Sequence, residues 1–200
     1  MAREENGMAR KKGLTFYEKE KKINKSTIHE ILFTLFYCGV AVFLAFVLVF
    51  SVGMKISMVG VSMEPALYNG QEVLINRFIY KITSPKRGDV IAFLPNGNQN
   101  SHYYLKRIVG LPGESIQIID GYVYINGERL PEDEYDKMAD YGIAGNEIQL
   151  GSDEYFVLGD NRNMSEDSRS GNIGAVKKDT IAGKVWFHLS CDEEGTGFVN

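Results

Sequence analysis

The feature that most constrains this chain is a run of 24 residues without a charged side chain, at residues 31–54. As an α-helix with a rise of about 1.5 Å per residue, the run would be roughly 36 Å long, enough to cross a hydrocarbon core of about 30 Å. A cleaved signal peptide is the main alternative, because Ser51-Val52-Gly53 resembles a cleavage site. The apolar region of a signal peptide, however, usually spans only about 7–15 residues. The sequence therefore predicts an uncleaved transmembrane helix at residues 31–54, in preference to a cleaved signal or a buried core helix.

Charged residues are distributed unevenly around this run. Residues 1–26 contain eight Lys and Arg against four Glu, which leaves 14 basic and 22 acidic residues for the rest of the chain. Because basic residues stay on the cytoplasmic side of a membrane span, we expect a cytoplasmic segment at residues 1–30 and an extracytoplasmic domain at residues 55–200 of a single-pass cell-membrane protein. The lipid bilayer is then a partner, and the acidic balance of the larger domain argues against nucleic acid as another.

The two cysteines add few constraints. Cys38 lies within the predicted span and Cys191 beyond it, so we do not expect them to pair with each other. Two cysteines are also too few for a disulfide framework or a typical structural zinc site, and no metal site is predicted.

The residues after the span have the pattern of β-structure, with short segments rich in Val, Ile, Tyr and Phe between turn signals. The predicted strands are residues 72–76, 89–94, 103–109, 115–119, 122–125, 128–130, 154–158 and 180–188. Asp120-Gly121 and Asn126-Gly127 favour type I′ turns, so residues 115–130 should form a three-stranded meander. Only a short helical turn is expected, near residues 64–67, and residues 96–100 and 131–146 are predicted to be exposed loops.

Four further segments contain residues that a β-sheet does not by itself require. They are GVSMEP at residues 60–65, KRGDVI at 86–91, YLKRIVGLPGE at 104–114 and GDNRNMSEDSR at 159–169. In this order behind an N-terminal anchor, they resemble the bacterial type I signal peptidases of Gram-positive kind, which are membrane-bound Ser/Lys proteases. The resemblance covers about residues 28–190. It implies a mainly β fold, in which one N-terminal transmembrane helix is followed by an antiparallel β-sheet catalytic domain of the signal peptidase and LexA-like type.

Ser62 and Lys106 are the candidate catalytic residues. Taken alone, Ser62 fits the N-cap of a short helix, and Lys106, which shares a strand face with Tyr104 and Ile108, could extend into solvent. Burial of that face would instead lower the pKa of Lys106, so that a neutral amine could accept the hydroxyl proton of Ser62. The resemblance implies the second arrangement, with Ser62 as nucleophile and Lys106 as general base, and this chemistry needs no cofactor. Arg107, on the opposite face, is expected to tolerate replacement.

The segment at residues 159–169 supplies the predicted supporting residues. From its residues alone it is a solvated charged loop, and a calcium loop is excluded because Arg162 stands at the third ligand position. The resemblance implies that Ser165 orients the lysine by a hydrogen bond, that Asp167 pairs with Arg169, and that Asp160 helps to hold the site together.

Gly60 is a departure from the pattern of many relatives. They carry a Ser at this position, two residues before the nucleophile, and its hydroxyl helps to bind the oxyanion. With Gly60 that donor is missing, so the oxyanion must be bound by backbone N–H groups, including that of Ser62. The sequence does not identify the second donor.

The position of Ser62 suggests the substrate. It lies seven residues beyond Lys55, so even an extended chain keeps it within about 25 Å of the membrane exit. The resemblance implies secretory preproteins with signal peptides as partners, cleaved after small residues in an A-x-A-like pattern. Whether the substrates are all exported proteins or a dedicated few stays open, as does dimerisation, and a monomer is the expectation.

Three other functions fit the sequence less well. A Ser-His-Asp triad could combine His102 with Asp160 or Asp167, but the segment around Ser62 lacks the second Gly of a G-x-S-x-G elbow. A self-cleaving Ser/Lys repressor would have a DNA-binding N-terminus where this chain has an apolar helix. A non-enzymatic anchored binding domain would have no need of the complete set of Ser62, Lys106, Ser165 and Asp167.

Overall fold

The N-terminal element is a single long helix. The structure, a computed structural model, describes residues 25–98, 101–131, 135–191 and 195–199, so residues 1–24 of the predicted cytoplasmic segment lie outside the described residues. Helix α1 runs from Lys25 to Val52. Within it, Lys25–Val49 has a mean hydropathy of 2.6 and is long and apolar enough to cross a membrane. The helix ends before Gly53, and Met54, which was expected in the span, pairs with Ile75 as the first residue of a strand instead.

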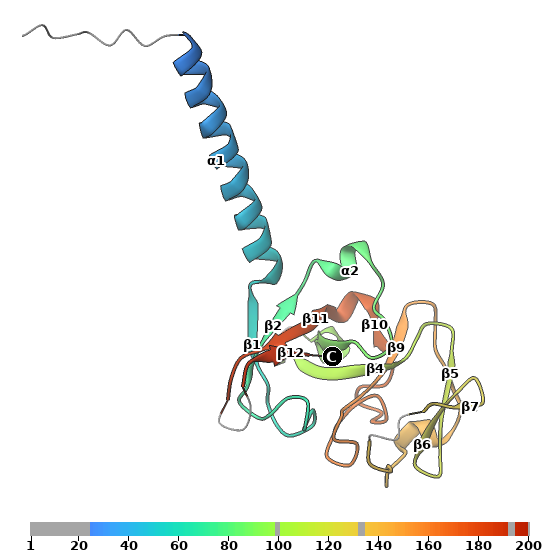
Figure 1. Cartoon of the computed structure of the whole chain (residues 1–200). Helices are drawn as coiled ribbons and strands as arrows, with labels where there is room; N and C mark the ends of the chain where they lie inside the picture. Colours follow the sequence, from blue (N-terminus) through green and yellow to red (C-terminus); the bar gives the residue numbers. More distant parts are fainter. Residues whose placement is uncertain (1–24, 99–100, 132–134, 192–194, 200) are drawn as a thin grey trace, which may run out of the picture. The chain divides into compact units, whose positions relative to one another are not determined.

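The remaining described residues form two antiparallel sheets (Figure 1). The larger sheet contains β1 (Met54–Ser57), β2 (Glu72–Asn76), β3 (Val90–Phe93), β4 (Tyr104–Gly110), β9 (Glu154–Leu158), β10 (Val176–Lys177), β11 (Ile181–His188) and β12 (Gly197–Phe198). Its order is β1-β2-β11-β3-β4-β9-β10, and β12 pairs with β11. Short helical elements are α2 (Ile79–Ile82) and the 3₁₀ turns η1 (Pro95–Gly97), η2 (Gly142–Gly145) and η3 (Lys178–Thr180). The mainly β, antiparallel fold predicted from the sequence is therefore confirmed.

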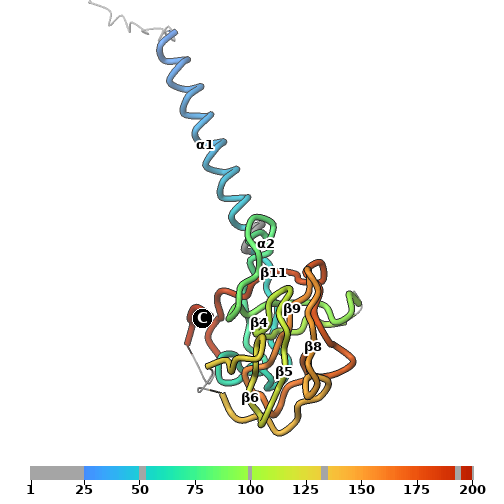
Figure 2. The backbone as a smooth tube through the Cα atoms, turned by 90° about the vertical axis from the view of Figure 1, so that its right-hand side faces the viewer, coloured from blue at the N-terminus to red at the C-terminus, as the bar shows by residue number. Residues whose placement is uncertain are grey.

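The smaller sheet contains the predicted meander. Its order is β7-β6-β5-β8, from β5 (Ser115–Ile119), β6 (Tyr122–Ile125), β7 (Glu128–Arg129) and β8 (Ile148–Gln149), and it faces the viewer in Figure 2. Asp120 and Asn126 have φ of 50° and 52°, and each is followed by a Gly with positive φ. Two successive positive φ angles define the type I′ turn, which confirms the prediction from the two dipeptides.

The loop expected at residues 131–146 is only partly exposed. Met138 and Ala144 are buried in the cluster beneath the smaller sheet, together with Ile116 and Val123. The prediction of an exposed segment was wrong at these two positions, because isolated apolar residues in a polar stretch leave no periodic pattern.

Candidate active site

Ser62 lies in an irregular segment that two buried side chains hold in place. Met63 and Leu67 are fully buried, and the Leu67 N–H donates to the carbonyl of Met63 (2.9 Å), which forms the turn expected at residues 64–67. Gly60 precedes Ser62 with φ of 83°, and its N–H donates to Asn69 Oδ1 (2.8 Å). Turns but no helix follow Ser62, so the alternative role as a helix N-cap does not apply.

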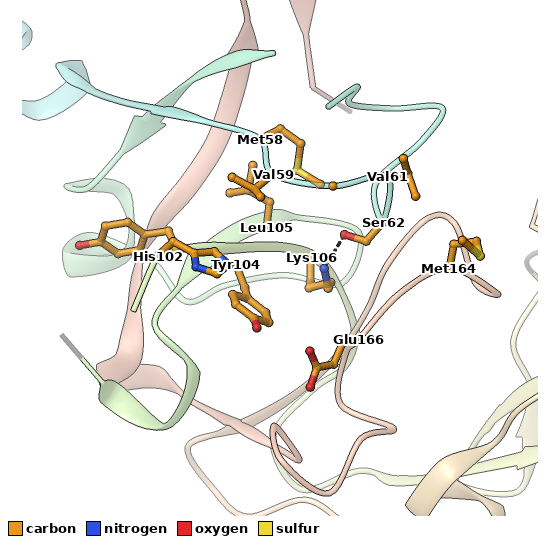
Figure 3. A pocket seen from close by; sticks show the side chains of 12 residues that line it. Met58, Val59, Val61, Ser62, His102, Tyr104, Leu105, Lys106, Met164 and Glu166 are labelled. Atoms are coloured by element: carbon orange, nitrogen blue, oxygen red, sulfur yellow. Dashed lines mark hydrogen bonds between the residues drawn. The ribbon is translucent and has the colours of Figure 1, made fainter. Parts of the chain in front are cut away.

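Lys106 lies on β4, in the middle of the larger sheet. Its neighbour on β3 is Ile91, and only 4% of the residue is exposed. The lysine Nζ donates a hydrogen bond to Ser62 Oγ at 2.6 Å, shown by the dashed line in Figure 3. The alternative in which Lys106 extends into solvent is therefore not observed.

The surroundings of Lys106 change its acidity. Burial disfavours the charged ammonium and lowers the pKa of Lys106 from 10.5 to about 8, while the carboxylates of Asp167, Glu166 and Asp160 act in the opposite direction. The Nζ also lies 5.6 Å from the centre of the Tyr104 ring. An amine with this pKa is partly neutral near pH 7, as a general base requires.

Two buried ion pairs fix the segment at residues 159–169. Asp167 accepts hydrogen bonds from Arg169 Nε (2.8 Å) and Nη2 (2.9 Å), and from the N–H of Gly159 (3.1 Å). Asp160 accepts from Arg107 Nε (2.8 Å) and Nη2 (2.7 Å). Because Arg107 follows Lys106 on β4, this second pair joins the strand that carries the lysine to the supporting segment.

The role of Arg107 was not anticipated. The sequence suggested a residue that tolerates replacement, whereas the guanidinium is nearly buried and also donates to the carbonyl of Gly88 (2.8 Å). Removing it would leave the carboxylate of Asp160 buried without its partner, which is costly. We therefore expect replacement of Arg107 to destabilise the site.

Ser165 is close to the site but does not make the expected contact. Its Oγ is buried and has no hydrogen-bond partner among the described residues, so the hydrogen bond to Lys106 that the resemblance implies is absent. The hydroxyl oxygen packs against Gly159 instead: a Cβ added to Gly159 would lie 2.2 Å from Ser165 Oγ and 2.4 Å from the carbonyl oxygen of Ser62. The N–H of Asn161 donates to that same carbonyl (3.1 Å).

A pocket of about 320 Å³ opens beside the Ser62–Lys106 pair (Figure 3). Its apolar lining comes from Met58, Val59, Val61, Leu105 and Met164. Glu166 lies at its edge, and the pKa of Tyr104 is raised first by burial and then by the charge of Glu166. The N–H of Ser62 makes no hydrogen bond to another described residue, so it is free to donate to a ligand in the pocket.

The geometry gives no support to a catalytic triad. His102 stacks on Tyr104 with ring centres 5.1 Å apart. The two aspartates that could serve such a triad are each bound to an arginine, Asp160 to Arg107 and Asp167 to Arg169. Within the described residues, no group of three His, Cys, Asp or Glu side chains could hold a metal ion.

Comparisons with known proteins match most of the chain. Residues 30–189 match the family described as signal peptidase, peptidase S26. Signal peptidase I P from Bacillus subtilis subsp. natto is 34% identical over 176 residues, which cover 84% of this chain and 91% of that protein. Signal peptidase IB from Staphylococcus aureus strain N315 is 32% identical over 170 residues, which cover 75% of this chain and 86% of that protein. A crystal structure of a signal peptidase I from Enterococcus faecalis V583 has 35% identity and a TM-score of 0.41, covering 52% of this chain and 97% of that chain.

Proposed function

The chain belongs to the signal peptidase family, peptidase S26, a family of serine proteases that remove signal peptides from preproteins, and we propose that Ser62 and Lys106 carry out the cleavage as nucleophile and general base. The observation that carries this assignment is the 2.6 Å contact between Lys106 Nζ and Ser62 Oγ, made by a lysine that is almost fully buried. A nucleophile and a base within hydrogen-bonding distance are the pair that acyl transfer requires.

The proposed reaction begins with the neutral form of Lys106. When the amine has lost its proton, the hydrogen bond reverses, and the Ser62 hydroxyl donates to Nζ. Lys106 then takes this proton as Oγ attacks the scissile carbonyl, and the Ser62 N–H stabilises the oxyanion that forms. Collapse of this intermediate breaks the peptide bond, and Lys106 returns the proton to the leaving amine of the mature protein. The neutral Lys106 amine then deprotonates the water that hydrolyses the acyl-enzyme, and this step releases the signal peptide.

The supporting residues hold Ser62 and Lys106 in position. Asp167 and Arg169 hold the segment at residues 159–169 in place, and Asn161 in that segment binds the carbonyl of Ser62. Asp160 holds the same segment to β4 through Arg107. We propose the orienting role for Ser165 as well: its closeness to Gly159 and Ser62 supports it, and the hydroxyl would reach Lys106 only after a rotation about the Cα–Cβ bond of Ser165.

The pocket favours small apolar side chains. Its walls of Met, Val and Leu contribute no charge, and its volume of about 320 Å³ is at the low end for ligand sites. We therefore infer that it accepts the small residues of an A-x-A-like cleavage site.

The family and the apolar helix together indicate a membrane-anchored protein. We propose further that it is a monomer with residues 1–30 in the cytoplasm and the β-domain outside, because basic residues precede the helix. In that orientation the bilayer holds the pocket close to the point where a precursor emerges.

The test is cleavage of a precursor with an A-x-A site by the full chain in detergent. We expect Ser62→Ala and Lys106→Arg to be inactive, since a guanidinium stays protonated at any working pH. The rate should rise with pH, with a midpoint near pH 8, and at pH 7 it should be about tenfold below the plateau reached at higher pH. His102→Ala is the matched control, because this residue lines the same pocket and should be dispensable. Cleavage by Lys106→Arg, together with an inactive His102→Ala, would refute the Ser/Lys assignment.

A further inference from the structure

A second groove lies between α2 and the start of β11. It has a volume of about 770 Å³, and the residues that line it include Arg77, Phe78, Lys81, Lys178 and Ile181. We call it the α2 groove. It adjoins the active-site pocket, because Tyr103 lines both.

The strand register places this groove near the point where the chain leaves the membrane. Helix α1 ends at Val52, and Met54 pairs with Ile75 of β2. Strand β2 ends at Asn76 and leads directly into α2, which packs beside β11 (Figure 1). With about 4.8 Å between strands and about 3.3 Å per residue along them, Phe78 lies within roughly 15 Å of Met54. The headgroup layer beyond the hydrocarbon core is itself several ångströms deep, so α2 is within its reach.

Three basic side chains of the groove have no acidic partner. Arg77, Lys81 and Lys178 are exposed and form no salt bridge with any described residue, and Asp179 is the one acidic residue of the lining. Several other basic residues of the domain do pair with an acidic side chain; Lys184, for example, pairs with Asp89 at 2.6 Å. A cluster of unpaired positive charge is unexpected in residues 27–200, which contain 14 basic and 22 acidic side chains.

Apolar side chains are also exposed to solvent at both ends of α2, at the preceding residue Phe78 and at its last residue, Ile82. Phe78 is 46% exposed and Ile82 is 70% exposed. The helix is nevertheless held firmly, because Asn76 Oδ1 accepts hydrogen bonds from the N–H groups of Phe78 and Ile79 (both 3.0 Å), and the Tyr80 hydroxyl donates to Asp89 (2.9 Å). Exposed aromatic and aliphatic residues beside Lys and Arg are typical of segments that lie in a membrane interface.

We propose that the α2 groove binds the headgroup of an anionic phospholipid from the leaflet in which α1 ends. The phosphate lies between Arg77, Lys81 and Lys178, and Phe78 and Ile82 enter the upper acyl region. Charge complementarity selects this occupant: the acidic domain as a whole is repelled by an anionic surface, and only a local basic site can turn one face toward it. Since Tyr103 connects the two sites, lipid binding would hold the entrance of the active-site pocket at the membrane surface.

The experiment uses the full chain in vesicles, with Cys38→Ala and Cys191→Ser replacing the two cysteines. Ser84→Cys, an exposed position two residues beyond Ile82, carries an environment-sensitive fluorophore. In vesicles of phosphatidylcholine with phosphatidylglycerol, we expect blue-shifted emission and protection from iodide quenching, compared with phosphatidylcholine alone. Each basic residue near an anionic surface strengthens binding by about fivefold. The double variant Arg77→Gln/Lys81→Gln should therefore lower the ratio of docked to undocked protein by about 30-fold.

The matched control is Arg129→Gln/Lys137→Gln, which removes the same two charges from the smaller-sheet side of the domain, where both side chains contact Tyr122. It should change the ratio less than twofold. An equal effect of the two double variants would overturn the proposal in favour of general charge attraction. A fluorophore that stays exposed in phosphatidylglycerol vesicles would overturn it as well, and so would the same shift produced by inorganic phosphate alone. Precursor cleavage in detergent should be unchanged in Arg77→Gln/Lys81→Gln, so this test is independent of the Ser/Lys assignment.

Discussion

Gly60 adopts a backbone conformation that other residues rarely adopt. Its φ of 83° is in the left-handed region, yet a Cβ added here would have no heavy atom within 4 Å. A side chain at this position therefore costs about 1–2 kcal/mol through the backbone alone, with no steric term. The simple expectation that Gly60→Ser is well tolerated, because it restores the hydroxyl of other relatives, must be set against this cost.

Comparison of Gly60→Ala with Gly60→Ser separates the two effects. Both variants should be destabilised by the same 1–2 kcal/mol or so, measured by thermal unfolding. If the added hydroxyl reaches the oxyanion, we expect Gly60→Ser to cleave a precursor at least about tenfold faster than Gly60→Ala, since removal of one such donor elsewhere costs roughly 100- to 1000-fold. Equal rates would show that the hydroxyl does not reach the reacting atoms.

The pairing of Ser62 with Lys106 could be anticipated at the residue scale, but that of Arg107 with Asp160 could not. The first pair follows from recognisable motifs and from the alternation of β4, which places Lys106 on one face with Tyr104 and Ile108. The second pair joins residues 53 positions apart, and the sequence of a polar motif does not indicate which charged side chains will pair with each other. The same holds for Ser165, whose rotamer the sequence does not determine.

At the scale of elements, the segment at residues 159–169 works as a brace behind Ser62. Its ion pairs fix it to itself and to β4, and Gly159 allows it to approach the Ser62 backbone closely. Glycine is required at position 159 for a steric reason and not for its backbone conformation, because there is no space for a Cβ atom there.

Gly159→Ala tests this brace. The added methyl group would lie 2.4 Å from the Ser62 carbonyl oxygen and 2.5 Å from Ser165 Cβ, so the segment and the nucleophile must separate. We expect precursor cleavage to fall at least about 100-fold, because displacements of about 1 Å have effects of this size. Gly171→Ala is the control, since its nearest neighbour, Ile143 Cγ2, would be 3.9 Å from the new methyl group. Full activity of Gly159→Ala would show that the close contact is not required.

Most strands that the sequence revealed are long enough to show a pattern, whereas β7, with two residues, was found through the Asn126-Gly127 turn before it. Residues 72–76, 115–119, 122–125 and 154–158 were predicted with the bounds that the structure has. Strands β8, β10 and β12 have two residues each, too few for alternation to be visible. Strand β1 was missed for another reason: it begins inside the uncharged run, where apolar residues of the anchor conceal its start.

At the scale of the whole molecule, the sequence predicts an orientation in the membrane that thiol labelling can test. On intact cells freed of outer wall barriers, a membrane-impermeant thiol reagent should label Cys191, which is partly exposed, and should leave Cys38 in α1 unlabelled. In the opposite compartment, Thr15→Cys should react only after the membrane is permeabilised, because basic residues before the span keep this segment inside. Labelling of Thr15→Cys on intact cells would reverse the proposed orientation.

The active site should also lower the stability of the whole protein. Burial lowers the pKa of Lys106 from 10.5 to about 8, and at 1.36 kcal/mol per pKa unit this costs the folded state about 3 kcal/mol below pH 8, where the lysine is charged in both states. Between pH 8 and 10.5 the unfolded chain binds more protons than the folded one, so stability should rise with pH across this window.

Lys106→Met removes this titration while keeping an unbranched side chain in the same space. We expect the variant to be more stable than the natural protein by about 3 kcal/mol below pH 8, and the difference to vanish as the pH approaches 10.5. Thermal unfolding of the full chain in detergent, followed by the fluorescence of its single tryptophan, Trp186, measures the difference at pH 7 and pH 10. Lys177→Met is the matched control, because it replaces a lysine by the same side chain at an exposed position. If Lys106→Met is instead less stable than the natural protein at pH 7, the lysine is held as a charged, well-paired ammonium, and it does not supply the neutral base that cleavage by Ser62 needs.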